Sequence, residues 1–235
     1  MFTLKTFLPP AAVLSLGLAW TPVHAQTSWS SELVDFTLVG GDPGALGEPE
    51  IVSDDTGVSL NFNPRPLSFD ALSDGNGQVD TEIIGFTLRA TAAPNQRITG
   101  VSWSENGVYQ VTGNGSWVSA FSSLRVADAQ THETIGDIGV DTFFAQGTND
   151  GVNGGPWNLN VNQALAANQV EIELTVKDIL AALAPENGFG WIEKDFGGLR
   201  VDVAPIPLPA SVWLLGSALF GLIMIGRRRS GRAQG

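Results

Sequence analysis

Short runs of alternating apolar and polar residues recur along the middle of the chain, separated by segments rich in glycine, asparagine and proline. The clearest run places four apolar residues in alternation with polar ones: Val170, Ile172, Leu174 and Val176 against Glu171, Glu173 and Thr175. Because successive side chains of a strand point to opposite faces, this pattern predicts a strand with one buried and one solvated face. Similar runs occupy residues 33–39, 58–63, 81–91, 97–103, 107–112, 116–121, 123–128, 157–162, 189–194 and 198–203.

The spacing of these runs predicts an all-β fold. Roughly ten strands about 8–15 residues apart, joined by turn sequences such as SDGNGQ and GTNDGVNGGP, are typical of an antiparallel β-sandwich or a jelly-roll-like domain. The stretch VKDILAALAP (residues 176–185) is the one possible helix, and Pro185 would end it. No internal repeat is apparent, so a single domain is the simplest partition.

The N-terminus has the layout of a secretory signal peptide. Lys5 precedes an apolar run, and small residues precede an expected cleavage between Ala25 and Gln26. The alternative is an uncleaved N-terminal anchor, which Pro9 and Pro10 argue against because they interrupt the run. We therefore expect a signal peptide at 1–25, an exported β domain at 26–205 and a C-terminal segment at 206–235.

The exported domain is strongly acidic and contains no cysteine. All 24 acidic residues of the chain but only 7 of its 12 basic ones lie in 26–205, which gives that part a net charge of −17. Nucleic acids and anionic lipids would be repelled, so neither is expected as a direct partner. Without cysteine, disulfides and thiolate chemistry are excluded, and the domain must hold together through its core.

Acidic loops raise the question of calcium. Asp74, Asn76 and Asp80 supply oxygen atoms within the segment DALSDGNGQVDTE, but they do not fit the spacing of an EF-hand loop. An Asn-Gly hairpin between two strands explains the same residues. We therefore expect no bound cofactor, with these three residues as a weak calcium candidate.

Aromatic residues are the candidates for ligand binding. A polysaccharide-binding module stacks sugars on exposed rings, whereas tryptophan on a strand more often packs in the core. The residues that could form such a sugar-binding platform are Trp103, Tyr109, Trp117, Trp157 and Trp191. Phe121, Phe143 and Phe144 are expected in the core.

The sequence offers little for catalysis. His132 is the only histidine in the exported part, it lies in a polar stretch, and no G-x-S-x-G elbow accompanies it. A zinc site is not expected without cysteine and with a single histidine. No residue is assigned a catalytic role, and a non-enzymatic protein is expected, with a hydrolase as the remote alternative.

The C-terminal segment carries the most specific pattern. A pentad of Ile206, Pro207, Leu208, Pro209 and Ala210 leads into an apolar block, residues 210–226, that ends at Arg227, Arg228, Arg229 and Arg232. As a helix this block would be about 26 Å long, near the shortest length that crosses a bilayer. The arginines would hold the C-terminus in the cytoplasm with the β domain outside.

This combination resembles the PEP-CTERM class of sorting signals, in the variant with the consensus Val-Pro-Leu-Pro-Ala. The pentad departs from that consensus only at Ile206. The resemblance implies a Gram-negative bacterium and recognition by an exosortase, a membrane-embedded cysteine transpeptidase. It also implies an inner-membrane-anchored precursor that ends at the cell surface or in the extracellular (biofilm) matrix.

Two functional hypotheses follow from these features. The first is a non-enzymatic surface or matrix protein that an exosortase processes. The second is a carbohydrate-binding module for exopolysaccharide, which would use the aromatic residues named above. The chemistry of the β domain does not decide between them.

Overall fold

A computed structural model describes residues 27–65, 68–149, 151–207, 214, 217 and 218 of the chain. Its strands form two sheets, and every pairing between named strands in this part is antiparallel. The sequence prediction of an antiparallel all-β domain of the sandwich type is confirmed at that level. The expected signal peptide and most of the expected C-terminal helix lie outside the described residues.

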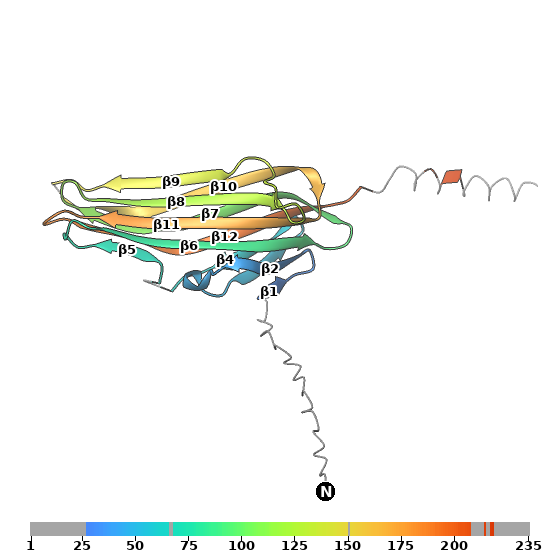
Figure 1. The fold of residues 1–235 in the computed structure, drawn as a ribbon, viewed down its shortest axis with the longest axis horizontal. Coiled ribbons are helices and arrows are strands. Elements are labelled where there is room, and N and C mark those ends of the chain that lie inside the picture. The colour runs from blue at the N-terminus through green and yellow to red at the C-terminus, as the bar shows by residue number, and fades with distance from the viewer. Residues whose placement is uncertain (1–26, 66–67, 150, 208–213, 215–216, 219–235) are drawn as a thin grey trace, which may run out of the picture.

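The first sheet has the order β1-β2-β6-β11-β8-β9. Its strands are β1 (Ser28–Ser30), β2 (Val34–Gly41), β6 (Val79–Ala92), β11 (Glu171–Leu183), β8 (Trp117–Asp128) and β9 (Gly139–Gln146). The second sheet has the order β10-β7-β12-β4-β3, and β5 also pairs with β12. Its strands are β10 (Asn153–Gln169), β7 (Gln96–Thr112), β12 (Phe189–Pro205), β4 (Gly57–Phe62), β3 (Glu50–Asp54) and β5 (Asp70–Ser73). A short 3₁₀ helix, η1 (Gly44–Leu46), follows β2. The long strands run along the long axis of the domain (Figure 1).

The core lies between the two sheets and is built from the inward-facing alternate residues. On β11, Ile172, Leu174, Val176, Leu180 and Ala182 are fully buried. Phe62, Phe86 and Trp103 bring three rings together from β4, β6 and β7, with centroids 5.7 to 6.2 Å apart. Aromatic packing of this kind, in addition to aliphatic burial, stabilises a sandwich that has no disulfide.

Two sequence predictions are corrected by the strand boundaries. The stretch 176–185 is not a helix, because β11 continues to Leu183 and pairs on both sides, with β6 and β8. The inward alternation that begins at Ile172 simply persists to Ala182, and tertiary pairing decides the conformation. The SDGNGQ turn does not close a hairpin, since it connects β5 of the second sheet to β6 of the first.

Candidate functional site

Two of the five predicted platform residues are buried and cannot contact a ligand at the surface. Trp103 is 0% exposed and Trp157 is 2% exposed. The indole of Trp157 donates a hydrogen bond to the backbone oxygen of Glu193 at 3.0 Å, which satisfies its polar atom inside the fold. For these two tryptophans the core interpretation is correct and the platform interpretation is wrong.

The other three predicted platform residues are partly exposed but lie apart. Trp191 of β12 pairs opposite Gln110 and Leu72, which places it on the outer face of the second sheet. Tyr109 packs on Phe143 with ring centroids 5.0 Å apart and donates to Oδ1 of Asn153 at 3.2 Å. The five aromatics therefore do not form one platform.

A different aromatic pair lies on the outer face of the first sheet. Trp117 of β8 and Phe144 of the edge strand β9 have ring centroids 6.1 Å apart. Phe144 is 57% exposed, so its expected place in the core is wrong. Phe121, on the same outward row of β8, is half-buried, whereas Phe143 faces inward and packs partly against the core. We call Trp117 and Phe144 the outer apolar patch.

The weak calcium candidate does not gather into a metal-binding group. Asp80 Oδ2 accepts a hydrogen bond from the backbone of Leu72 at 2.7 Å, and Asn76 Oδ1 accepts one from Gln78 at 2.8 Å. These oxygens thus shape the turn between β5 and β6. Across the described residues, no three His, Cys, Asp or Glu side chains are placed to hold a metal ion.

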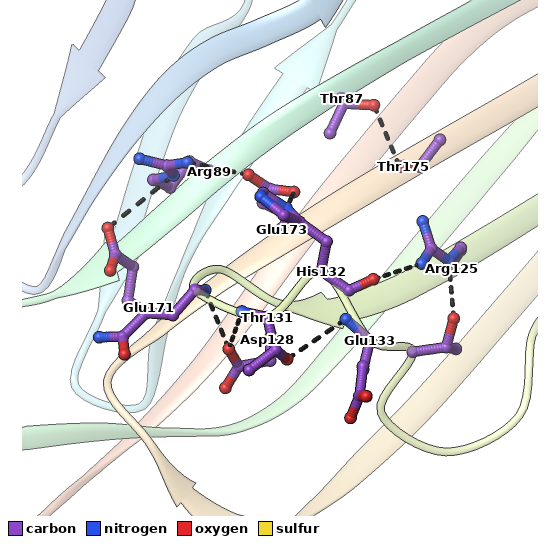
Figure 2. Close-up of polar contacts among 12 residues, drawn as sticks. Thr87, Arg89, Arg125, Asp128, Thr131, His132, Glu133, Glu171, Glu173 and Thr175 are labelled. Carbon is purple, nitrogen blue, oxygen red and sulfur yellow. Dashed lines mark hydrogen bonds and ion pairs between the residues drawn. The ribbon is translucent and has the colours of Figure 1, made fainter.

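His132 belongs to a polar network on the outer face of the first sheet. Its Nδ1 lies 2.8 Å from Oε2 of Glu173 on β11, and Arg89 Nη2 donates to Oε1 of the same carboxylate at 2.9 Å (Figure 2). Arg125 donates to the backbone oxygen of His132 at 2.8 Å. The loop that carries His132 is fixed by Asp128, whose Oδ1 accepts backbone hydrogen bonds from Thr131 and Gln130.

Charge and hydrogen bonding set the protonation of this network. Partial burial works to raise the pKa of Glu173, but hydrogen bonds from Arg89 and His132 outweigh it and lower that pKa. Backbone hydrogen bonds from Thr131 and Gln130 lower the pKa of Asp128. His132 itself is 65% exposed on an open sheet face. Three surface hollows of the described residues lie near residues 30–33, 99–102 and 42–49, and His132 lines none of them.

The most unusual chemistry is buried between the sheets, where three charged side chains meet. Lys194 of β12, Glu105 of β7 and Asp178 of β11 each have fully buried side chains. The Lys194 ammonium nitrogen contacts Oε2 of Glu105 and Oδ2 of Asp178. We call these three residues the buried triad.

Local strand geometry explains how each member of the buried triad faces inward. Asp178 continues the inward series of β11, and Glu105 continues the inward series of β7 two residues after Trp103. On β12 the pairing with β7 is irregular between Lys194 and Phe196. Lys194 points into the core together with Ile192, two residues before it, and the bulge that follows changes the parity so that Leu199 and Val201 face inward beyond it.

The buried triad escaped the sequence prediction. The parity of Asp178 within the clearest run could have revealed an inward carboxylate, but that segment was considered as a possible helix. The inward position of Lys194 follows from its alternation with Ile192, but a lysine two residues after an apolar position does not by itself indicate burial.

Little of the C-terminal signal is described. Ile206 directly follows β12, and its N–H donates to the backbone oxygen of Asn95 at 2.8 Å. Leu208, Pro209, Ala210 and the four arginines lie outside the described residues, as do Ala25 and Gln26. Among the described residues, no helix has the length and apolar character needed to cross a bilayer.

Comparisons with known proteins do not assign a family. No family model and no curated protein matches the chain. One similar solved structure is TmCBM61 in complex with β-1,4-galactotriose, with 14% identity, a TM-score of 0.19, and coverage of 72% of this chain and 88% of that one. Another is infectious bursal disease virus Gt strain, with 14% identity, a TM-score of 0.26, and coverage of 74% and 52%. A third is the enzymatically active domain of bacteriophage CBA120 tailspike protein 4, with 10% identity, a TM-score of 0.20, and coverage of 73% and 19%. At these TM-scores the likenesses carry no argument about what this chain binds or does.

Proposed function

We propose that the chain is a non-enzymatic exported protein of the cell surface or extracellular matrix, sorted by an exosortase-like enzyme through its C-terminal segment. The observation that carries the proposal is the position of the motif. The last strand, β12, ends at Pro205, and the Ile-Pro-Leu-Pro-Ala pentad begins at the next residue. The motif therefore starts directly after β12.

The chemistry of the residues after β12 supports this proposal. Ile206 is still tied to the domain through its hydrogen bond to Asn95, whereas Pro207 and Pro209 have no N–H to donate. Prolines also disfavour helix in the residues before them, so the pentad favours an extended backbone between the domain and the apolar block. An enzyme that works at the membrane surface can grip such a backbone as an added strand.

Mass spectrometry of the C-terminus in the native host tests this proposal. We expect the mature protein to lack residues 227–235 and to retain β12. A Pro207→Ala, Pro209→Ala variant should accumulate with its C-terminal arginines in place, while a Val212→Ala control should be processed normally. A mature wild-type protein that still carries residues 227–235 would leave a simple membrane anchor.

A second candidate is exopolysaccharide binding at the outer apolar patch. Trp117 and Phe144 present two neighbouring rings on one outer sheet face, and this pair is the surface on which a sugar would stack in this candidate function. Binding of the purified protein to the host's own exopolysaccharide should fall at least tenfold in Trp117→Ala and Phe144→Ala. Trp191→Ala, on the outer face of the other sheet, is the matched control. Equal binding by all four proteins would exclude this mechanism.

A further inference from the structure

The buried triad is costly as a set of free ions. Each member lies in an interior lined by apolar side chains, where a charge loses the hydration that stabilises it in water. Phe69 and Trp103 cover the lysine nitrogen, with ring centroids 5.0 and 5.5 Å from Nζ. Lys194 contacts Oδ2 of Asp178, and Ser122 and Trp103 are the neutral side chains that assist Lys194 in stabilising the Glu105 carboxylate.

Burial shifts the pKa values of Lys194 and Glu105 toward their uncharged forms. Burial lowers the pKa of Lys194 to about 8, although the Glu105 carboxylate works against this change. Burial also raises the pKa of Glu105, and the nearby lysine only partly offsets that effect. A proton can therefore pass from the ammonium to a carboxylate, which leaves a nucleophilic amine in contact with a carboxyl group.

We propose that Lys194 and Asp178 condense to an intramolecular isopeptide bond inside the folded domain, with Glu105 as the catalytic residue. The bond would join β12 of the second sheet to β11 of the first. This bond would give the domain a covalent cross-link that it cannot form through disulfides, because it has no cysteine.

The reaction balances without any co-reactant. The Lys194 nitrogen attacks Cγ of the protonated Asp178 carboxyl group and forms a C–N bond. Glu105 accepts the proton that the nitrogen gives up and donates a proton to the departing hydroxyl. The C–O bond of Asp178 breaks, one water molecule leaves, and Glu105 returns to its initial protonation state.

The fold provides the proximity and the proton transfer that an amine and a carboxyl group lack when they meet in water. The fold holds amine and carboxyl in contact, which replaces a bimolecular encounter with an intramolecular one. Glu105 contacts the same nitrogen, within reach of the proton that must move. The amide product carries no charge, so its formation removes the buried Lys194–Asp178 ion pair, while the excluded water cannot readily reverse the reaction.

Tryptic peptide mapping of the full-length folded protein tests the bond directly. Trypsin cuts after Lys177, Lys194 and Arg200, so free Lys194 gives two peptides, 178–194 and 195–200. The isopeptide bond removes the charge that trypsin recognises at Lys194. We then expect one cyclised peptide spanning 178–200 whose mass is lower than the sequence mass by one water molecule. Neither terminal signal lies in this peptide, so the result does not depend on exosortase processing.

Variants assign the roles of the three residues. Glu105→Gln should retain free Lys194 and give the two separate peptides, with bond formation slowed at least a hundredfold. Asp178→Ala should do the same. Asp178→Asn should lose ammonia in place of water and give a cyclised peptide of the same mass as wild type, a result that a purely structural Asp178 would not produce.

Each outcome decides a part of the proposal. Complete cutting at Lys194 in the folded, aged wild-type protein would overturn the bond. A cross-link that forms at the wild-type rate in Glu105→Gln would overturn the role of Glu105. Because the decisive measurement uses wild-type protein, a variant that fails to fold does not remove the test, and near-ultraviolet circular dichroism checks the fold of each variant.

Discussion

Replacement of the whole buried triad by apolar residues separates a covalent cross-link from a buried ion cluster by the sign of the change in stability. The variant is Lys194→Met, Glu105→Met, Asp178→Val, which keeps side chains of similar shape at all three positions. It removes every buried charge of the site at once, so no unpaired ion remains to confuse the result.

The two interpretations predict opposite changes in the free energy of unfolding. If the three residues are only ions, apolar replacement is neutral or stabilises the fold by about 1–4 kcal/mol. If Lys194 and Asp178 are joined, the bond closes a loop of about 15 residues, and its loss costs about 3 kcal/mol in the loop-entropy treatment used for disulfides. We therefore expect the triple variant to be less stable than wild type by about 2–3 kcal/mol.

Urea unfolding followed by tryptophan fluorescence measures this difference, with the slope m compared between the two proteins. Lys177→Met is the matched control, since Lys177 precedes Asp178 on β11 and is exposed. Its free energy of unfolding should stay within about 0.5 kcal/mol of wild type. A triple variant as stable as wild type, or more stable, would refute the reasoning.

Three further changes test other parts of the fold. Gly107→Ala should destabilise the domain by about 1–3 kcal/mol in urea unfolding, because the added Cβ would lie 1.9 Å from the Glu193 backbone oxygen. Gly155→Ala is the control, since the space around Gly155 is open. Equal effects of the two substitutions would contradict the close approach at Gly107. Leu174→Ala, at a fully buried position of β11, should cost about 2–5 kcal/mol, and a loss below about 1 kcal/mol would argue against the assigned core. The fold lowers the pKa of Glu173, so the stability that this carboxylate contributes is present above its unfolded pKa and is lost as the pH falls through its folded pKa. The difference in unfolding free energy between wild type and Glu173→Gln should therefore shrink from pH 7 to pH 3. A constant difference would contradict the hydrogen-bond network around Glu173.

Alternation alone was enough to predict the class of fold and most strand positions, because one face of each strand packs on the core. The sequence prediction divided long strands into pieces where the alternation is interrupted. Residues 97–103 and 107–112 are parts of one strand, β7, which runs through Ser104, Glu105 and Asn106. A buried carboxylate at Glu105 interrupts the apolar alternation that identifies a strand. For this reason the sequence pattern does not show that β7 is continuous through Glu105.

The candidate site was harder to predict for a related reason. Whether an aromatic residue faces the core or the solvent depends on parity, and parity needs the exact register of each strand. Trp103 and Trp117 each follow a serine, yet the first is inward on β7 and the second is outward on β8. The bulge after Lys194 resets parity within β12, and the contact of Lys194 with Asp178 joins two sheets that only the tertiary fold brings together.

The two proposals meet on β12. A protein that is held through residues beyond Ile206 receives any pulling force first on this strand, which lies between β7 and β4 and pairs with β5 at its other end. Hydrogen bonds along β12 can then break one after another from Pro205 inward. An isopeptide bond at Lys194 stops that separation and passes the load to β11, which is paired on both sides in the other sheet. The cross-link would therefore be placed where anchoring through the C-terminal segment makes it useful, on the last strand before the point of attachment.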